Sequence, residues 1–398
     1  MPDILSQGRD REPGQRRWGR LTVVAVLIAA AAVVVGLRLP WPGHAHHRAA
    51  ASSRSASGPA VISLPRVPDG VAGPTRRWPP GLRVPVTGPQ PAWYWPATGR
   101  EQPIGGLPRE RVDYSFARTA GGWVIQPGSP SDPSCADCAG HLLPVYFLND
   151  QASSVTVVGL ADGVAPAVQP GRLWLTSFPP GASLDTAAGT AQEVSLSGTR
   201  VGPSLRLPPG YLVDQATTRG LLLGAAPVGR AMTTDRLWNP ADHRADRTFD
   251  NVIATGPDEV AWAPPCTSVC RARVLNLATG RGTVITMPRG STAASGSFSP
   301  DGRLLALQVS YSTGSAGGSL AMQLEVASVA SGRLTAVPGT WASSDALVGF
   351  GWPASGDSLV AELGFTTKVQ LTAWRPGAAR LAVVALNPRE AATAIVVG

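Results

Sequence analysis

The chain has 398 residues, of which 43% are hydrophobic and only 15% are charged, and it contains 45 glycines and 38 prolines. This length is sufficient for one large closed β domain, and the density of turn-forming residues excludes a mainly helical fold. The formal net charge is +8, but the basic residues are scattered, and Lys368 is the only lysine among them. Without a basic stripe, this charge favours an ordinary solvated surface, and we expect no nucleic-acid partner.

Residues 1–20 form a basic tail, which an uncharged apolar segment follows. The stretch from Leu21 to Leu37 just reaches the ~17 residues that a membrane-spanning helix requires. It is longer than the apolar part of a secretory signal, so we expect an uncleaved, single-pass transmembrane helix over residues 21–39, with cleavage near His44 as the alternative. The five arginines of the tail place the N-terminus in the cytoplasm by the positive-inside bias, and the bulk of the chain outside it.

Residues 40–90 are rich in proline, alanine and serine and show no periodicity, which is typical of a solvated linker. His44, His46 and His47 fall in this linker. A metal site requires a preformed geometry that a linker does not supply, so we interpret these histidines as solvated. The folded domain is therefore expected over residues 91–398.

Within this domain, one pattern recurs: a turn of small residues, glycine or proline, and then a short apolar strand. The clearest copy is Ser297–Leu307, with the sequence SFSPDGRLLAL. Degenerate copies occur at residues 117–125, 168–175, 216–223, 254–262 and 353–360. An array of short strands with tight turns at this spacing predicts an all-β fold, a β-propeller.

Each repeat reads as a four-stranded antiparallel blade whose inner strand comes first. The inner strands are predicted to begin near Val112, Val164, Tyr211, Val252, Gly296 and Leu347. These six blades leave Ala92–Ile104, the outer half of a blade, and the orphan strand Ala391–Val397. We expect these two segments to share a seventh blade, because the closed ring then has no exposed strand edge. Six blades with an additional first hairpin are the alternative.

The segment Phe298–Leu305 resembles the signature of TolB-like and WD40-like propeller repeats, as does the following strand pair with its turn at Ala330–Arg333. The resemblance covers most of residues 92–390, and one repeat is near the consensus. The preference for arginine over lysine is typical of GC-rich coding, as in actinobacteria. The resemblance implies a propeller, often extracytoplasmic in bacteria, that serves as an interaction platform, and together with the apolar segment 21–39 it gives the expectation of a membrane-anchored propeller. It carries over no catalytic residue, because the Pro-Asp-Gly motif forms a hairpin turn.

The four cysteines form two close pairs, Cys135 with Cys138 and Cys266 with Cys270. An even number of cysteines in an exported chain predicts disulfides. Both pairs fall between the second and third strands of their repeats, in blades three apart, whereas bonded Cα atoms lie within about 7 Å of each other. We therefore expect each pair to bond within its own loop. The alternatives are a redox motif, which would require a helix after Cys135, and a zinc site, which would require all four sulfurs to converge.

The sequence contains no nucleophile elbow, metalloprotease helix, calcium-binding loop or phosphate-binding loop. We therefore expect no catalytic residue, metal or cofactor. The densest charged stretch, Asp235–Arg247, allows a sugar- or cation-binding loop, but we interpret it as a solvated outer hairpin of the fourth full blade. Four tryptophans recur at equivalent positions and allow a ligand-stacking ring, but we expect them to pack between blades. They are Trp123, Trp174, Trp262 and Trp352.

These features favour a non-enzymatic binding platform, which docks a protein or an envelope polymer on the face that carries the cysteine loops. One alternative is an enzyme, a lyase or glycoside hydrolase, with its site in the central channel. Titratable side chains that converge on the channel mouth would favour the enzyme, and a lining of small neutral residues would favour the platform. The other alternative is a sensor that signals through the short cytoplasmic tail.

Overall fold

The computed structural model describes residues 78–79, 81–86, 90–108, 114–127, 142–183, 186–225, 234–266, 269–311, 321–343, 347–365 and 368–386. All of them belong to one compact unit, Pro59–Gly398. Every regular element among them is a β-strand, as the turn-rich composition predicts. These residues include no helix capable of crossing a membrane, and the expected transmembrane segment 21–39 lies outside them.

The strands form seven antiparallel sheets, and in each sheet they pair in the order of the chain. The first sheet has three strands: β1 (Val84–Val86), β2 (Ala92–Trp95) and β3 (Arg100–Pro103). The second has β4 (Tyr114–Thr119), β5 (Gly122–Pro127), β6 (Leu143–Asn149) and β7 (Thr156–Ala161). The third has β8 (Gly163–Pro166), β9 (Arg172–Ser177), β10 (Ala188–Ser195) and β11 (Leu205–Pro209).

The remaining four sheets repeat this arrangement. The fourth has β12 (Tyr211–Thr217), β13 (Gly220–Ala225), β14 (Thr234–Asn239) and β15 (Arg244–Asp250). The fifth has β16 (Val252–Thr255), β17 (Glu259–Trp262), β18 (Arg271–Asn276) and β19 (Gly282–Thr286). The sixth has β20 (Ser291–Phe298), β21 (Leu304–Tyr311), β22 (Ala321–Ser328) and β23 (Leu334–Ala336), with β24 (Ala342–Ser343) also on β22. The seventh has β25 (Leu347–Gly351), β26 (Leu359–Phe365), β27 (Lys368–Trp374) and β28 (Ala382–Leu386).

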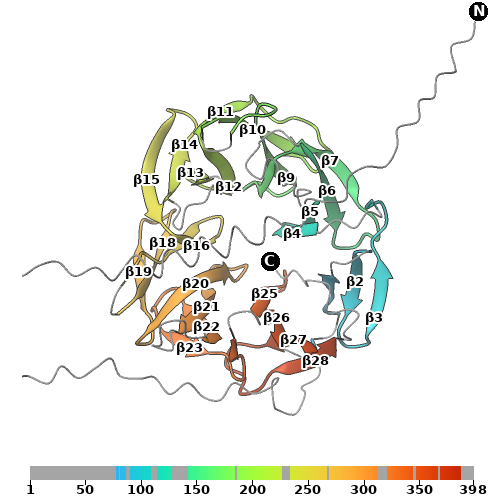
Figure 1. Ribbon diagram of the computed structural model, residues 1–398, viewed down its shortest axis with the longest axis vertical. Coiled ribbons are helices and arrows are strands. Elements are labelled where there is room, and N and C mark those ends of the chain that lie inside the picture. Colours follow the sequence, from blue (N-terminus) through green and yellow to red (C-terminus); the bar gives the residue numbers. More distant parts are fainter. Residues whose placement is uncertain are drawn as a thin grey trace, which may run out of the picture. The chain divides into compact units, whose positions relative to one another are not determined.

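The sheets surround a common centre, with strands such as β4, β12 and β20 innermost and β7, β15 and β23 at the perimeter (Figure 1). The fold is thus a seven-bladed β-propeller, which confirms the predicted blade count and excludes the alternative of six blades. The predicted starts of the inner strands fall within about five residues of the observed ones. The largest difference is in the sixth sheet, where β20 begins at Ser291 instead of near Gly296.

The first sheet begins earlier than the sequence indicated. β1, at Val84–Val86, pairs with β2, so the propeller starts inside the segment 40–90 that we interpreted as a linker. The three-residue strand has Pro85 at its centre and carries no recognisable alternation, which is why the pattern missed it. The orphan segment Ala391–Val397 lies outside the described residues, and its place in the first sheet stays a prediction.

Apolar side chains fill the space between each pair of neighbouring sheets. Central strands bury both of their faces: on β13, Leu221 and Leu223 pack toward the third sheet, whereas Leu222 packs toward the fifth. Seven such clusters join the seven sheets. One of them places Val84 and Val86 of the first sheet against Val360 and Leu371 of the seventh. Side-chain packing therefore closes the ring around its whole circumference.

The antiparallel order divides the connections between two faces of the ring. Turns between the first and second strands of a sheet lie on one face, which we call the hairpin-turn face. Loops between the second and third strands lie on the opposite face. One of these joins β17 to β18 and contains Cys266 and Cys270, so we call that side the cysteine-loop face.

Candidate functional site

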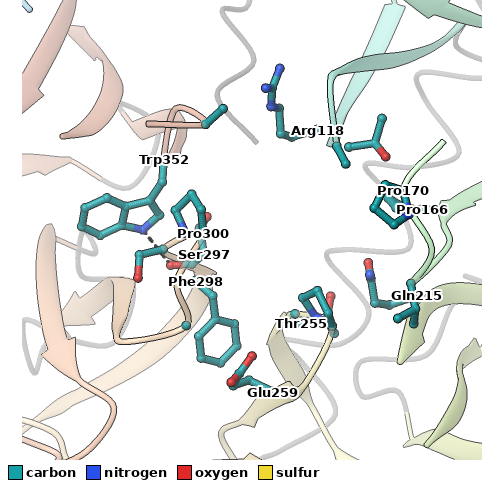
Figure 2. A pocket seen from close by; sticks show the side chains of 18 of the residues that line it. Arg118, Pro166, Pro170, Gln215, Thr255, Glu259, Ser297, Phe298, Pro300 and Trp352 are labelled. Atoms are coloured by element: carbon teal, nitrogen blue, oxygen red, sulfur yellow. Dashed lines mark hydrogen bonds between the residues drawn. The ribbon is translucent and has the colours of Figure 1, made fainter. Parts of the chain in front are cut away.

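A cavity of about 450 Å³ opens at the centre of the hairpin-turn face. It is lined by residues of six sheets, all in or beside the turns that follow the inner strands (Figure 2). These are Arg118, Thr119, Ala120, Gly121, Pro166, Ala167, Val168, Pro170, Gln215, Thr255, Gly256, Pro257, Glu259, Ser297, Phe298, Ser299, Pro300, Gly302, Trp352 and Ala354. The cavity therefore lies on the face opposite to the one where we expected a ligand to dock.

The turn between β20 and β21 shows how the local sequence builds the wall of this cavity. The Ser299 hydroxyl donates to Oδ1 of Asp301 at 2.6 Å and accepts from the backbone N–H of Leu304 at 2.9 Å. The bond from Ser299 lowers the pKa of Asp301 below its ordinary value. Gly302 closes the turn at a φ of 67°, where residues with a Cβ are strained. The turn thus confirms the hairpin predicted from Pro-Asp-Gly, and it places Pro300 at the cavity wall.

Arg118 is one of two lining residues with an ionisable side chain. Its guanidinium donates from both terminal nitrogens to the carboxylate of Asp150, at 2.5 and 2.7 Å. It also lies over the ring of Trp123, 5.1 Å from the centroid. This bidentate pair holds the arginine at the end of β4 and neutralises its charge.

Glu259, at the start of β17, is the other titratable lining residue. The Asn276 amide donates to its Oε1 at 3.1 Å. Burial raises the pKa of Glu259, the bond from Asn276 lowers it in part, and the charge of neighbouring Asp258 raises it again. In the part of the chain that the structure describes, no basic side chain lies within 4.0 Å of this carboxylate. Glu259 therefore brings an unbalanced negative charge to the cavity.

The rest of the lining is neutral and mostly small: alanine, glycine, proline, serine and threonine, with Phe298 and Trp352 as its aromatic members. In the described lining, therefore, titratable side chains do not converge as they do in a typical catalytic site. No group of three or more potential metal ligands occurs among the described residues. Sequence reasoning did not single out Arg118 or Glu259. The only signal was an acidic pair, Asp258 and Glu259, at the start of an apolar strand.

The four recurring tryptophans pack between blades, as predicted. Trp123 is buried between the first and second sheets, and Trp352 between the sixth and seventh. Trp174 packs against the cluster between the third and fourth sheets, and Trp262 against the one between the fourth and fifth. Trp352 has a second role, because it also lines the cavity, and its indole N–H donates to the backbone oxygen of Ser297 at 3.0 Å. This bond ties the seventh sheet to the sixth at the cavity wall.

The charged stretch Asp235–Arg247 forms the outer hairpin β14–β15, as predicted, but in the third of the four-stranded sheets and not the fourth. Its first member is not solvated. Asp235 is buried and accepts from the backbone N–H groups of Ala225 and Val252. Desolvation, together with the charge of Asp214, raises the pKa of Asp235 to about 6. The prediction of a solvated hairpin is therefore confirmed for its tip and wrong for Asp235, which the fifth sheet covers.

Cys266 and Cys270 form a disulfide within the loop between β17 and β18, with their Cα atoms 5.3 Å apart. This confirms local pairing for the second pair. Cys135 and Cys138 lie outside the described residues, so their pairing stays a prediction. Cys270 packs against the core between the fifth and sixth sheets.

Replacing Cys266 and Cys270 together by serine is expected to leave a folded, β-rich domain. Closing so short a loop contributes at most about 2 kcal/mol on the chain-entropy model, so the free energy of unfolding falls only modestly. Thermal unfolding followed by circular dichroism measures this loss. Peptide mapping of the parent protein that showed either cysteine bonded to Cys135 or Cys138 would contradict the pairing.

Several solved structures are similar to this chain at low sequence identity, and a β-propeller domain is among them. TolB from Acinetobacter baumannii is 13% identical, with a TM-score of 0.38 over 65% of this chain and 64% of that one. The β-propeller domain of the Trilobed protease from Pyrococcus furiosus is 8% identical, with a TM-score of 0.45 over 69% and 84%. Hydrazine synthase from Kuenenia stuttgartiensis is 11% identical, with a TM-score of 0.42 over 65% and 75%. No protein-family model and no curated protein sequence matches the chain.

Proposed function

We propose that this propeller is a non-enzymatic binding platform that accepts a projecting segment of a protein partner in its central cavity. The observation that supports this proposal is the lining: hairpin turns from six sheets enclose about 450 Å³ with mostly small neutral side chains and two aromatic ones. Such a concave and largely apolar surface suits the binding of a ligand. The cavity moves the proposed docking site from the cysteine-loop face to the hairpin-turn face.

Site-specific photo-crosslinking in living cells tests which face binds. A photoreactive residue at Ala120 or Ala354, both exposed at the cavity, is expected to form a discrete crosslinked product. The control position is Val269, which is 51% exposed on the cysteine-loop face. Crosslinks from Val269 alone would place the partner on that face and contradict a role for the cavity.

The platform is further proposed to be tethered outside the cytoplasm by the apolar segment 21–39, on the grounds of its length and of its basic flank. A reporter enzyme that is active only outside the cytoplasm, fused after Gly398, is therefore expected to be active. The matched control carries a second reporter that is active only in the cytoplasm, and this fusion is expected to be silent. The opposite pattern would overturn the proposed localisation, and with it the argument for disulfides.

A further inference from the structure

We propose that the cavity recognises a positively charged side chain, a lysine or arginine of the partner, through Glu259 and Phe298. This inference rests on the proposed binding function and specifies the chemistry of the ligand at that site. The carboxylate of Glu259 and the ring of Phe298 come from neighbouring sheets and lie together on one side of the cavity (Figure 2).

The backbone leaves room for the Glu259 carboxylate between two hairpin turns. A methyl group at Gly302 would lie 2.9 Å from its Oε1, and one at Gly256 would lie 3.2 Å from its Oε2. The same position at Gly256 is 3.6 Å from Cδ2 of Phe298, so the ring and the carboxylate adjoin. A carboxylate beside an aromatic ring suits an amine or guanidinium at the end of an apolar stem.

The charges around the cavity select a cation over an anion. Arg118, on the other side of the cavity, is already paired with Asp150. Asn276 is the one side chain among the described residues that donates a hydrogen bond to Glu259, and it is neutral. Asp258 adds a second negative charge near Glu259. A cation from the ligand would therefore balance the negative charge on this side of the cavity.

The high net charge of the whole chain does not oppose this inference. Residues 1–77 hold eleven arginines and four acidic residues, so they account for seven of the eight net positive charges. The remainder of the chain is close to neutral, and charges farther away than about 10 Å are largely screened at physiological salt. The field at the cavity is therefore decided by its own residues.

The test compares two peptides with the purified full-length protein in detergent. One is the blocked pentapeptide Gly-Gly-Lys-Gly-Gly, and the other carries norleucine, which has a similar apolar stem without the charge. We expect the lysine peptide to bind roughly tenfold more tightly than the norleucine peptide, because it makes one additional, partly buried hydrogen bond between charged groups. NMR titration measures both affinities. This preference is expected to shrink in 0.5 M salt, where charge pairs are screened.

Glu259→Gln is expected to remove the preference, because the amide keeps an acceptor for Asn276 but has no charge. The matched control is Glu193→Gln, which removes a partly buried carboxylate paired with Arg172 at 3.6 Å, outside the cavity lining. Equal binding of the two peptides by the parent protein, or a preference that survives in Glu259→Gln, would overturn the inference and leave the cavity as a binding site for neutral groups. If neither peptide binds, the inference fails, and the crosslinking from Ala120 and Ala354 judges the proposed function independently.

Discussion

Removal of the last eight residues, 391–398, is expected to abolish most of the soluble monomeric protein. The first sheet has three strands where every other sheet has at least four. Its strands β2 and β3 form the outer hairpin. Strand β1 packs against β26, which is the second strand from the centre in the seventh sheet, so β1 corresponds to a second strand as well. The innermost position of this sheet is thus the one for which the described residues supply no strand.

The segment Ala391–Val397 has the length and composition to fill that position. Four residues separate it from the end of β28 at Leu386, the same number that connects β19 to β20. Without it, β1 presents unpaired hydrogen-bonding groups to other chains, and aggregation is expected to follow. Size-exclusion chromatography of the protein that lacks only residues 391–398 measures the loss of soluble monomer.

The control for this experiment deletes the same number of residues from the basic tail, residues 2–9, and is expected to leave the elution profile unchanged. If residues 391–398 were an unpaired tail, their deletion would also leave the elution profile unchanged, because termini that are not tied down tolerate truncation. A truncated protein that stays monomeric, with the melting curve of the parent, would reject closure of the ring by this strand.

Leu371→Ala is expected to destabilise the propeller strongly. Leu371 on β27 is 0% exposed and lies in the cluster that joins the seventh sheet to the first. Replacing a fully buried leucine by alanine costs about 2–5 kcal/mol, because the surrounding side chains only partly fill the resulting cavity. At this position the loss falls on the contact that closes the ring, so we expect a melting temperature lower by at least about 5 °C.

Leu160→Ala is the matched control. Leu160 is 58% exposed on the outer strand β7, and truncating it is expected to change the free energy of unfolding by less than about 0.5 kcal/mol. Thermal unfolding of the two variants and the parent, followed by circular dichroism, makes the comparison. Equal melting temperatures for the two variants would show that packing between the first and last sheets contributes little to stability.

The sequence by itself determined the features that depend on neighbouring residues. The turn at Ser299–Gly302 follows from the chemistry of serine, proline, aspartate and glycine in that order, and the inner strands follow from their apolar patterns. The bond between Cys266 and Cys270 likewise follows from their spacing, since only a short loop separates them. In each case the interactions that stabilise the feature lie within a few residues, so the sequence was sufficient to predict them.

Only the tertiary structure decided which residues meet. β1 is too short and too rich in proline to show a pattern, and it is a strand because β2 and the seventh sheet hold it in place. Asp235 is buried because a strand of the next sheet covers it, although its neighbours in sequence are charged and exposed. Glu259 and Phe298 adjoin because two turns from consecutive sheets approach at the centre of the ring. Contacts between such turns depend on how far each sheet is rotated about the common centre, and the packing of large side chains between sheets sets that rotation.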